Sequence, residues 1–302
     1  MKVIVNRKQY DKLIKEGRGY SKNVEKWADY VTDEVLLPIT KQDVEEDVYL
    51  LTKLSLKLNG KDFYENLPID SIILHVNLVE TEDDEASIDI QYTPFYTQIV
   101  ENEDGSYNIL DVEFEITMVL PKDRSDIDIS VLHYHFSSSL SHEFMHVNEW
   151  VNRGLKTPKE NKGCEGIYIE GSIDGDAVDR IGYMLYVALS YENNAFVQQA
   201  GTMISKRKPE NRQQFMTYLK ENPIYTFVET MLSYDPNIYL EEINNLDRDR
   251  LSQLYKIMMC FYSKDGIPKI KSIDKFLSDV DRKFKMTGEY LKRKLLGLIT
   301  VV

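Results

Sequence analysis

The chain has 302 residues, which is long enough for one large domain or two lobes with a sizeable apolar core. Its 50 acidic residues outnumber its 37 lysines and arginines, so the net charge is −13, and the basic residues are scattered among acidic ones. Nucleic acids and anionic membranes attract proteins through clustered positive charge, so this composition argues against both as partners.

The ends of the chain predict a soluble protein. The basic opening is not followed by the apolar stretch and small-residue cleavage site of a signal peptide. The longest apolar run near an end, residues 295–302, is far shorter than the roughly 20 residues that span a bilayer. Cys164 and Cys260 belong to no CxxC or Cys-His pattern, and we expect both to be reduced, in a reducing compartment.

The first part of the chain mixes helical and strand-like patterns. Residues 3–5 are a short strand candidate, and residues 8–16 and 22–37 look helical. The apolar residues of the second helix at helical spacing are Val24, Trp27, Ala28, Val31 and Val35. Residues 41–52 continue in this style, but alternating leucines follow before the turn pair Asn59-Gly60, so this stretch stays open between helix and strand.

From Ser71 the apolar period changes to two, which indicates a sheet. Residues 71–79 and 87–92 are predicted strands, and residues 95–100 could extend the second past Pro94. Asp104-Gly105 marks a hairpin into a strand over 107–119, whose apolar face is predicted to be core. The residues of that face are Val112, Phe114, Ile116 and Met118. If this strand edges a cleft, it could pair with an extended peptide, and Glu113 and Glu115 on its polar face would prefer basic substrates.

From about residue 126 nearly every segment looks helical, which predicts an α+β fold with strands first and helices afterwards. Residues 153–172 are expected to form a loop with one short strand, and 174–206 one long helix. Further helices break around Pro223, Asp235-Pro236 and residues 266–268, and an amphipathic helix covers about 272–298. The predicted parts are 1–125 with the sheet, 126–206 with the metal-binding helices, and a helical 207–302, together one compact catalytic unit.

Residues 142–146 read His-Glu-Phe-Met-His, the His-Glu-x-x-His arrangement. Residues i and i+4 lie on one face of a helix, so His142 and His146 can share a zinc ion at about 2.0 to 2.1 Å each. Glu143 follows the first ligand and is placed to take a proton from water activated by the metal. The sequence therefore predicts a zinc site with Glu143 as general base, against the alternative that the motif lies on a core helix without metal.

A catalytic zinc needs a third protein ligand. A His-Glu-x-x-His-x-x-Gly-x-x-His pattern is absent, because Glu149 and Arg153 stand where its glycine and third histidine would be. Glu192, in an otherwise apolar or amide-rich helical stretch, is the predicted third ligand, against the alternative of a solvated helix glutamate. Glu149 lies about 10 Å from His142 along a straight helix, so we favour a hydrogen bond to a ligand for it.

Other candidate residues receive structural interpretations. Acidic residues at the predicted start of the 174–206 helix are explained by its dipole. They are Asp174, Asp176 and Asp179. His135 would share a face with His142 if the helix began near residue 127, but we favour core or partly exposed roles for His133 and His135 and a structural role for His75. Tyr183 or Tyr191 could stabilise an oxyanion opposite the metal, and the sequence does not choose between them.

The segment from Ile127 to Trp150, together with residues 189–199, resembles a group of zincin-like metallopeptidases found in bacteriophages and prophages. In that group the HExxH helix is followed by a helix with a Glu-x-x-Ala signature, which Glu192 and Ala195 match. The resemblance implies a gluzincin-type site, with His142, His146 and Glu192 on zinc, and a location in the bacterial host cytoplasm or in the virion. It covers only these segments of the chain.

The sequence thus predicts a zinc-dependent metallopeptidase that acts on a peptide or protein substrate. The main alternative is a non-catalytic zinc-containing structural or interaction protein, for instance a phage virion component with a structural partner. A third interpretation is zinc-dependent hydrolysis of a non-peptide amide.

Overall fold

A computed structural model describes most of the chain from Tyr20 onwards. The described residues are 20–41, 48–55, 57–58, 61–62, 69–81, 87–92, 98–101, 107–121, 128–152, 167–168, 174–264, 267–268 and 271–300. They divide into two compact units, one of residues 21–156 and the other of Tyr20 with residues 157–302. The predicted strand at 3–5 and helix at 8–16 lie outside the described residues. The HExxH helix groups with the sheet in the unit of residues 21–156, and the predicted parts 1–125, 126–206 and 207–302 stay a prediction.

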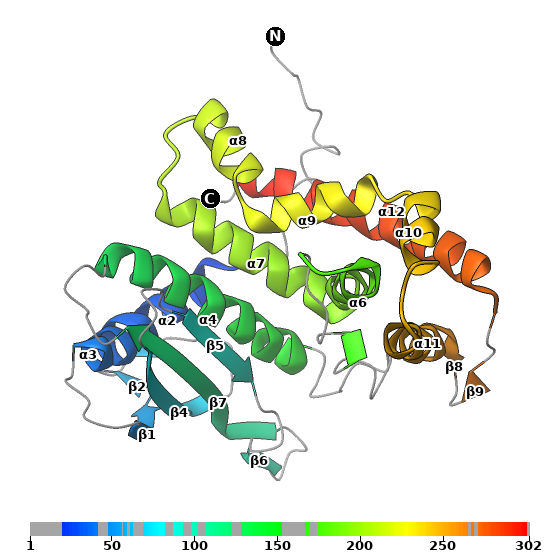
Figure 1. Cartoon of the computed structure of the whole chain (residues 1–302). Coiled ribbons are helices and arrows are strands. Elements are labelled where there is room, and N and C mark those ends of the chain that lie inside the picture. Colours follow the sequence, from blue (N-terminus) through cyan, green and yellow to red (C-terminus); the bar gives the residue numbers. More distant parts are fainter. Residues whose placement is uncertain are drawn as a thin grey trace. The chain divides into compact units, whose positions relative to one another are not determined.

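The unit of residues 21–156 contains a mixed sheet (Figure 1). Its strands are β1 (Val48–Ser55), β4 (Ile69–Thr81), β5 (Ser87–Tyr92), β6 (Gln98–Glu101) and β7 (Tyr107–Pro121), in the order β1-β4-β7-β5 with β6 also on β7. Strands β4 and β7 pair in parallel and the other pairs are antiparallel. The two-residue strands β2 (Lys57–Leu58) and β3 (Lys61–Asp62) form a separate hairpin. The α+β class and the strands after Ser71 are confirmed, and the open stretch at 41–52 contains the start of a strand.

One face of this sheet is core, as the alternating pattern predicts. Val112, Phe114, Ile116 and Met118 of β7 are all at most 1 % exposed, and their β4 partners in register, Leu74, Val76 and Leu78, are buried as well.

The prediction that strand β7 lies at the edge of a cleft, where it could pair with an extended peptide, is wrong. Strand β4 occupies one edge of β7, and β5 and β6 occupy the other, so the backbone groups of β7 are already paired. Alternation in the sequence predicts which face of a strand is buried, but not which strands lie beside it.

Two helical layers accompany the sheet in this unit. Helix α2 (Lys22–Val31) continues through the π-helix η2 (Thr32–Leu36) into α3 (Leu37–Thr40), confirming the predicted helix at 22–37. A series of buried residues repeats every four positions, Val24, Ala28, Thr32, Leu36 and Thr40. Because an α-helix repeats every 3.6 residues, such a stripe would wind around it, and the wider π turn keeps the stripe facing one way.

The second layer is α4 (Ile129–Asn152), which packs against α2, η2, α3 and β5. It begins after Asp128, whose side chain accepts a hydrogen bond from the Ser130 amide at 2.8 Å. This helix contains the whole HExxH motif, so the predicted helical context of the motif is confirmed.

The other unit is almost entirely helical, as predicted for the C-terminal part. Its helices are α6 (Ala177–Val187), α7 (Ser190–Lys206), α8 (Arg212–Lys220), α9 (Pro223–Leu232), α10 (Pro236–Ile243), α11 (Arg248–Tyr262), α12 (Ile273–Gly297) and the 3-10 turn η4 (Leu298–Thr300). Strands β8 (Ser263–Lys264) and β9 (Ile267–Pro268) form a short hairpin. Prolines at the starts of α9 and α10 coincide with the predicted breaks. Ile167 and Tyr168, where a short strand was expected, are helical.

The prediction of one long helix over 174–206 is wrong, because the chain breaks between α6 and α7 at Ala188 and Leu189. Leu189 is extended and 4 % exposed, and its carbonyl accepts the Asn193 side-chain amide at 2.6 Å. Neither residue at the break is a glycine or proline. Both residues are buried, so tertiary packing ends the helix where local propensity would continue it, and the Asn193 bond belongs to the first turn of α7.

Close packing also explains one glycine of α7. A Cβ atom on Gly201 would lie 2.3 Å from Cδ2 of Tyr20, which is 9 % exposed. A glycine at this position lets the tyrosine ring lie directly on the helix backbone.

Cys260 is 8 % exposed near the end of α11 and is disulfide-bonded, which contradicts the expectation that it is reduced. Cys164 lies outside the described residues. Within the described part of the chain, no helix combines the length and the apolar character needed to cross a bilayer.

Asp279 of α12 is expected to stabilise the helical unit at neutral pH. Hydrogen bonds from Lys275, Lys271 and Tyr262 lower the pKa of this carboxyl from 3.8 to about 2, against the opposing effect of burial. A carboxyl whose pKa is lowered by folding contributes stability above its unfolded value, and the contribution is lost as the pH falls from about 4 towards 2.

We expect Asp279→Asn to lower the free energy of unfolding at pH 7 by about 1 kcal/mol, because the lysine side chains are 41 % and 54 % exposed and solvent screens them. Urea unfolding of both proteins at pH 7 and pH 2.5 measures this. The difference between them should shrink at the lower pH, and a constant difference would contradict the assignment.

Candidate metal centre

The orientation of the motif is set by the residue at its middle. The Phe144 ring packs edge-on against Trp27 of α2, at 5.0 Å between ring centroids, and against Phe114 of β7, at 4.9 Å. Phe144 is 3 % exposed, so this side of α4 faces the core. His142 and His146 lie two residues before and after it, each about 200° around the helix. Burial of Phe144 therefore turns both imidazoles to the opposite side of α4.

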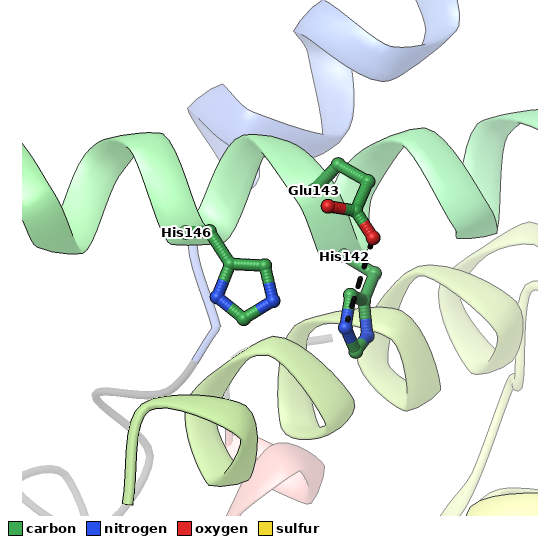
Figure 2. Close-up of side chains that lie close together, drawn as sticks. All are labelled: His142, Glu143 and His146. Atoms are coloured by element: carbon green, nitrogen blue, oxygen red, sulfur yellow. Dashed lines mark ion pairs between the residues drawn. The ribbon is translucent and has the colours of Figure 1, made fainter. Parts of the chain in front are cut away.

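The two imidazole rings lie side by side on α4, as the spacing predicts (Figure 2). Their centroids are 4.9 Å apart and their planes meet at 76°. His142 is 7 % exposed and His146 is half-buried. Rings on adjacent turns with this separation can direct one nitrogen each towards a common point.

Glu143 completes a compact group with the two histidines. Its Oε1 atom lies 3.9 Å from His142 Nε2, and its side chain is 18 % exposed. One potential ligand atom from each of the three residues lies within 4.8 Å of the others. In a tetrahedral zinc site with bonds of 2.0 to 2.1 Å the donors are about 3.4 Å apart, so modest side-chain rotations would let the two imidazoles share an ion with the Glu143 carboxylate beside it. The donor types, two imidazoles and a carboxylate, also suit zinc.

Glu192, the predicted third ligand, lies in the first turn of α7 and belongs to the other unit. Its role as a ligand stays a prediction. The residue is only 3 % exposed, so the alternative of a solvated helix glutamate is wrong. Buried carboxylates are normally paired, hydrogen-bonded or bound to metals, and this one is a candidate for such a role.

Of the two tyrosines considered for oxyanion stabilisation, Tyr183 is electrostatically coupled to Glu192. Burial raises the pKa of the Tyr183 hydroxyl, and the Glu192 carboxylate raises it further. Its ring packs edge-on against Phe227 at 5.3 Å. Its hydroxyl therefore stays protonated, a hydrogen-bond donor, at neutral pH.

Several other candidates have structural partners. His75 Nε2 lies 3.0 Å from Glu113 Oε2, and His133 Nε2 lies 3.2 Å from Asp33 Oδ1, which supports the structural interpretation of both histidines. His135 is exposed and its ring lies edge-on to Tyr134.

The acidic residues before α6 and in its first turn also behave as predicted. Asp176 is the N-cap of the helix and accepts hydrogen bonds from the Val178 and Asp179 amides. Arg250 donates to Asp176 at 2.7 Å and lies 2.7 Å from Asp179. These contacts explain the two aspartates without a metal, and Asp174 is exposed.

Sequence reasoning missed the contacts that hold α4 in place, namely Phe144 with Trp27 and Phe114, and Ser137 with Asp29. Phe144 itself is 3 % exposed. Its partners lie far away in sequence, and no local pattern identifies them.

Comparison of the chain with protein families, with characterised proteins and with solved structures finds no match. The candidate site accordingly stands on the geometry of His142, Glu143 and His146 and on the chemistry of these three side chains.

Proposed function

We propose that the protein is a zinc-dependent hydrolase of peptide bonds, with His142, His146 and Glu192 as metal ligands and Glu143 as general base. The observation that carries the proposal is the group of His142, Glu143 and His146, whose ligand atoms lie within 4.8 Å of one another on one helix. The location proposed with it is the host cytoplasm or the virion.

Each residue of the group has a distinct task in this proposal. A zinc ion supplies Lewis-acid chemistry, polarising a carbonyl and making water a stronger acid. The two imidazoles hold the ion through neutral ring nitrogens and take no part in proton transfer. Glu143, close to His142 and partly exposed, accepts a proton from the attacking water and returns it to the departing amine. Its side chain is 18 % exposed, so solvent water can reach the carboxylate.

A non-catalytic zinc site is the second candidate, and the low exposure of His142 favours it, because structural zinc sites are closed. In that case the protein would be a structural or interaction protein, such as a virion component.

Metal analysis of the purified protein followed by a protease assay separates the two candidates. We expect about one zinc per chain and cleavage of denatured casein that stops with 1,10-phenanthroline and returns when zinc is added. Zinc without chelator-sensitive cleavage would favour the structural role. A protein that holds no zinc even after reconstitution would refute both.

A further inference from the structure

Among the described residues, three side-chain contacts between the first helical layer (α2, η2 and α3) and α4 show that the two run antiparallel. Trp27 of α2 contacts Phe144, and Asp29 of α2 accepts a hydrogen bond from the Ser137 hydroxyl. One turn further along, Asp33 of η2 lies beside His133. As the residue numbers in α2 and η2 increase, the numbers of the residues that they contact in α4 decrease. All three contacts lie within the unit of residues 21–156.

The Ser137 hydroxyl behaves differently from those of its neighbours in the same helix. Ser138 donates to the His135 carbonyl at 3.0 Å and Ser141 to the Ser138 carbonyl at 2.8 Å, so both bond their own helix. A buried helical serine commonly does this. Ser137 is fully buried, yet its hydroxyl crosses to a carboxylate on another helix. Asp29 itself is half-buried. A charge-assisted bond of this kind is directional, and a polar contact between packed helices can specify register.

The contact between His133 and Asp33 is the weaker of the two polar contacts described here. His133 is 25 % exposed and Asp33 is 57 % exposed, and solvent-exposed pairs contribute little. Of these two contacts, the Asp29–Ser137 bond is the one expected to influence the register of α4.

We propose that Asp29 is a positioning residue for the metal site, acting through Ser137 on the rotation and register of α4; this inference rests on the proposed function. The burial of Phe144 fixes which face of α4 meets the core, and the directional Asp29–Ser137 bond fixes a second point of the helix, seven residues away. A slip of α4 by one residue would rotate its faces by about 100°. His142 and His146 would then no longer present their nitrogens on the side opposite the core. The Asp29–Ser137 bond opposes that slip and keeps both imidazoles ready to share an ion.

Zinc affinity of the full chain, measured by competition with a chromophoric chelator, tests the proposal in four variants. Ser137→Ala and Asp29→Ala should each weaken zinc binding roughly tenfold, equivalent to about 1.4 kcal/mol. The double variant should lose no more than either single one, because both remove the same bond. Asp29→Asn keeps an acceptor oxygen and should bind zinc nearly as the wild type does.

Ser141→Ala is the matched control. It removes an equally buried hydroxyl from the same helix, next to His142, but one that bonds its own backbone. Its zinc affinity should be unchanged. The visible spectrum of the cobalt-substituted protein, which reports ligand geometry, should change in Ser137→Ala and not in Ser141→Ala. A purely structural role for Ser137 would lower the unfolding midpoint without moving either readout.

Unchanged affinity in Ser137→Ala, or an equal loss in Ser141→Ala, overturns the positioning role alone. A wild-type chain that binds neither zinc nor cobalt overturns the proposed site itself and this inference with it. The wild-type titration therefore distinguishes the two failures.

Discussion

Glu143→Gln should abolish hydrolysis while the protein keeps its zinc. Glutamine is nearly isosteric with glutamate, so the imidazoles of His142 and His146 keep their places, but the amide cannot accept the proton of the attacking water. Loss of a general base typically costs a factor of about 10² to 10⁴ in rate. The measurement is the rate of casein cleavage per zinc-loaded chain, with zinc content determined on the same sample.

Glu241→Gln is the control for this substitution, because Glu241 is an exposed glutamate of α10, in the other unit. It should retain full activity. If the Glu143→Gln protein hydrolyses casein as fast as the wild type, Glu143 is not the base and the proposed mechanism fails.

Replacing either histidine of the pair should remove the metal. His142→Ala and His146→Ala each delete one of the proposed ligands of the ion. We expect zinc affinity to fall by at least roughly 100-fold, beyond the loss seen when only supporting residues are changed. Activity should disappear together with the zinc. Isothermal titration of the metal-free proteins measures the affinity.

His135→Ala provides the comparison, since His135 lies on the same helix but is exposed and outside the group of three. Its zinc affinity should match that of the wild type. Retention of zinc by His142→Ala or His146→Ala, with normal affinity, would contradict the assignment of the ligands. Circular dichroism of each variant shows whether α4 remains folded.

Much of the local structure could be predicted from the sequence. The alternation of Val112, Phe114, Ile116 and Met118 predicts a strand with one buried face, and that face is buried. The spacing of His142 and His146 places two imidazoles on one side of a helix, and their rings do lie together. Both patterns depend only on the repeat of a single helix or strand, which residues close in sequence determine.

Other features could not be predicted, because they depend on partners far away in the chain. The interior position of β7 follows from its pairing with β4 on one edge and β5 and β6 on the other. The break at Ala188 and Leu189 has no glycine or proline to mark it, and both residues are buried in the helical unit. In both cases tertiary contacts outweigh a weak local preference.

The sequence by itself thus determines that a His-Glu-x-x-His group exists on a helix, because that geometry repeats within one turn. Only the tertiary structure decides which way the group faces. Phe144 enters the core between Trp27 and Phe114, and Ser137 bonds Asp29, so α4 has one rotation in which both histidines turn away from the sheet. The physical reason is that the rotation of a helix is set by the neighbours it packs against, and no spacing within the helix specifies them.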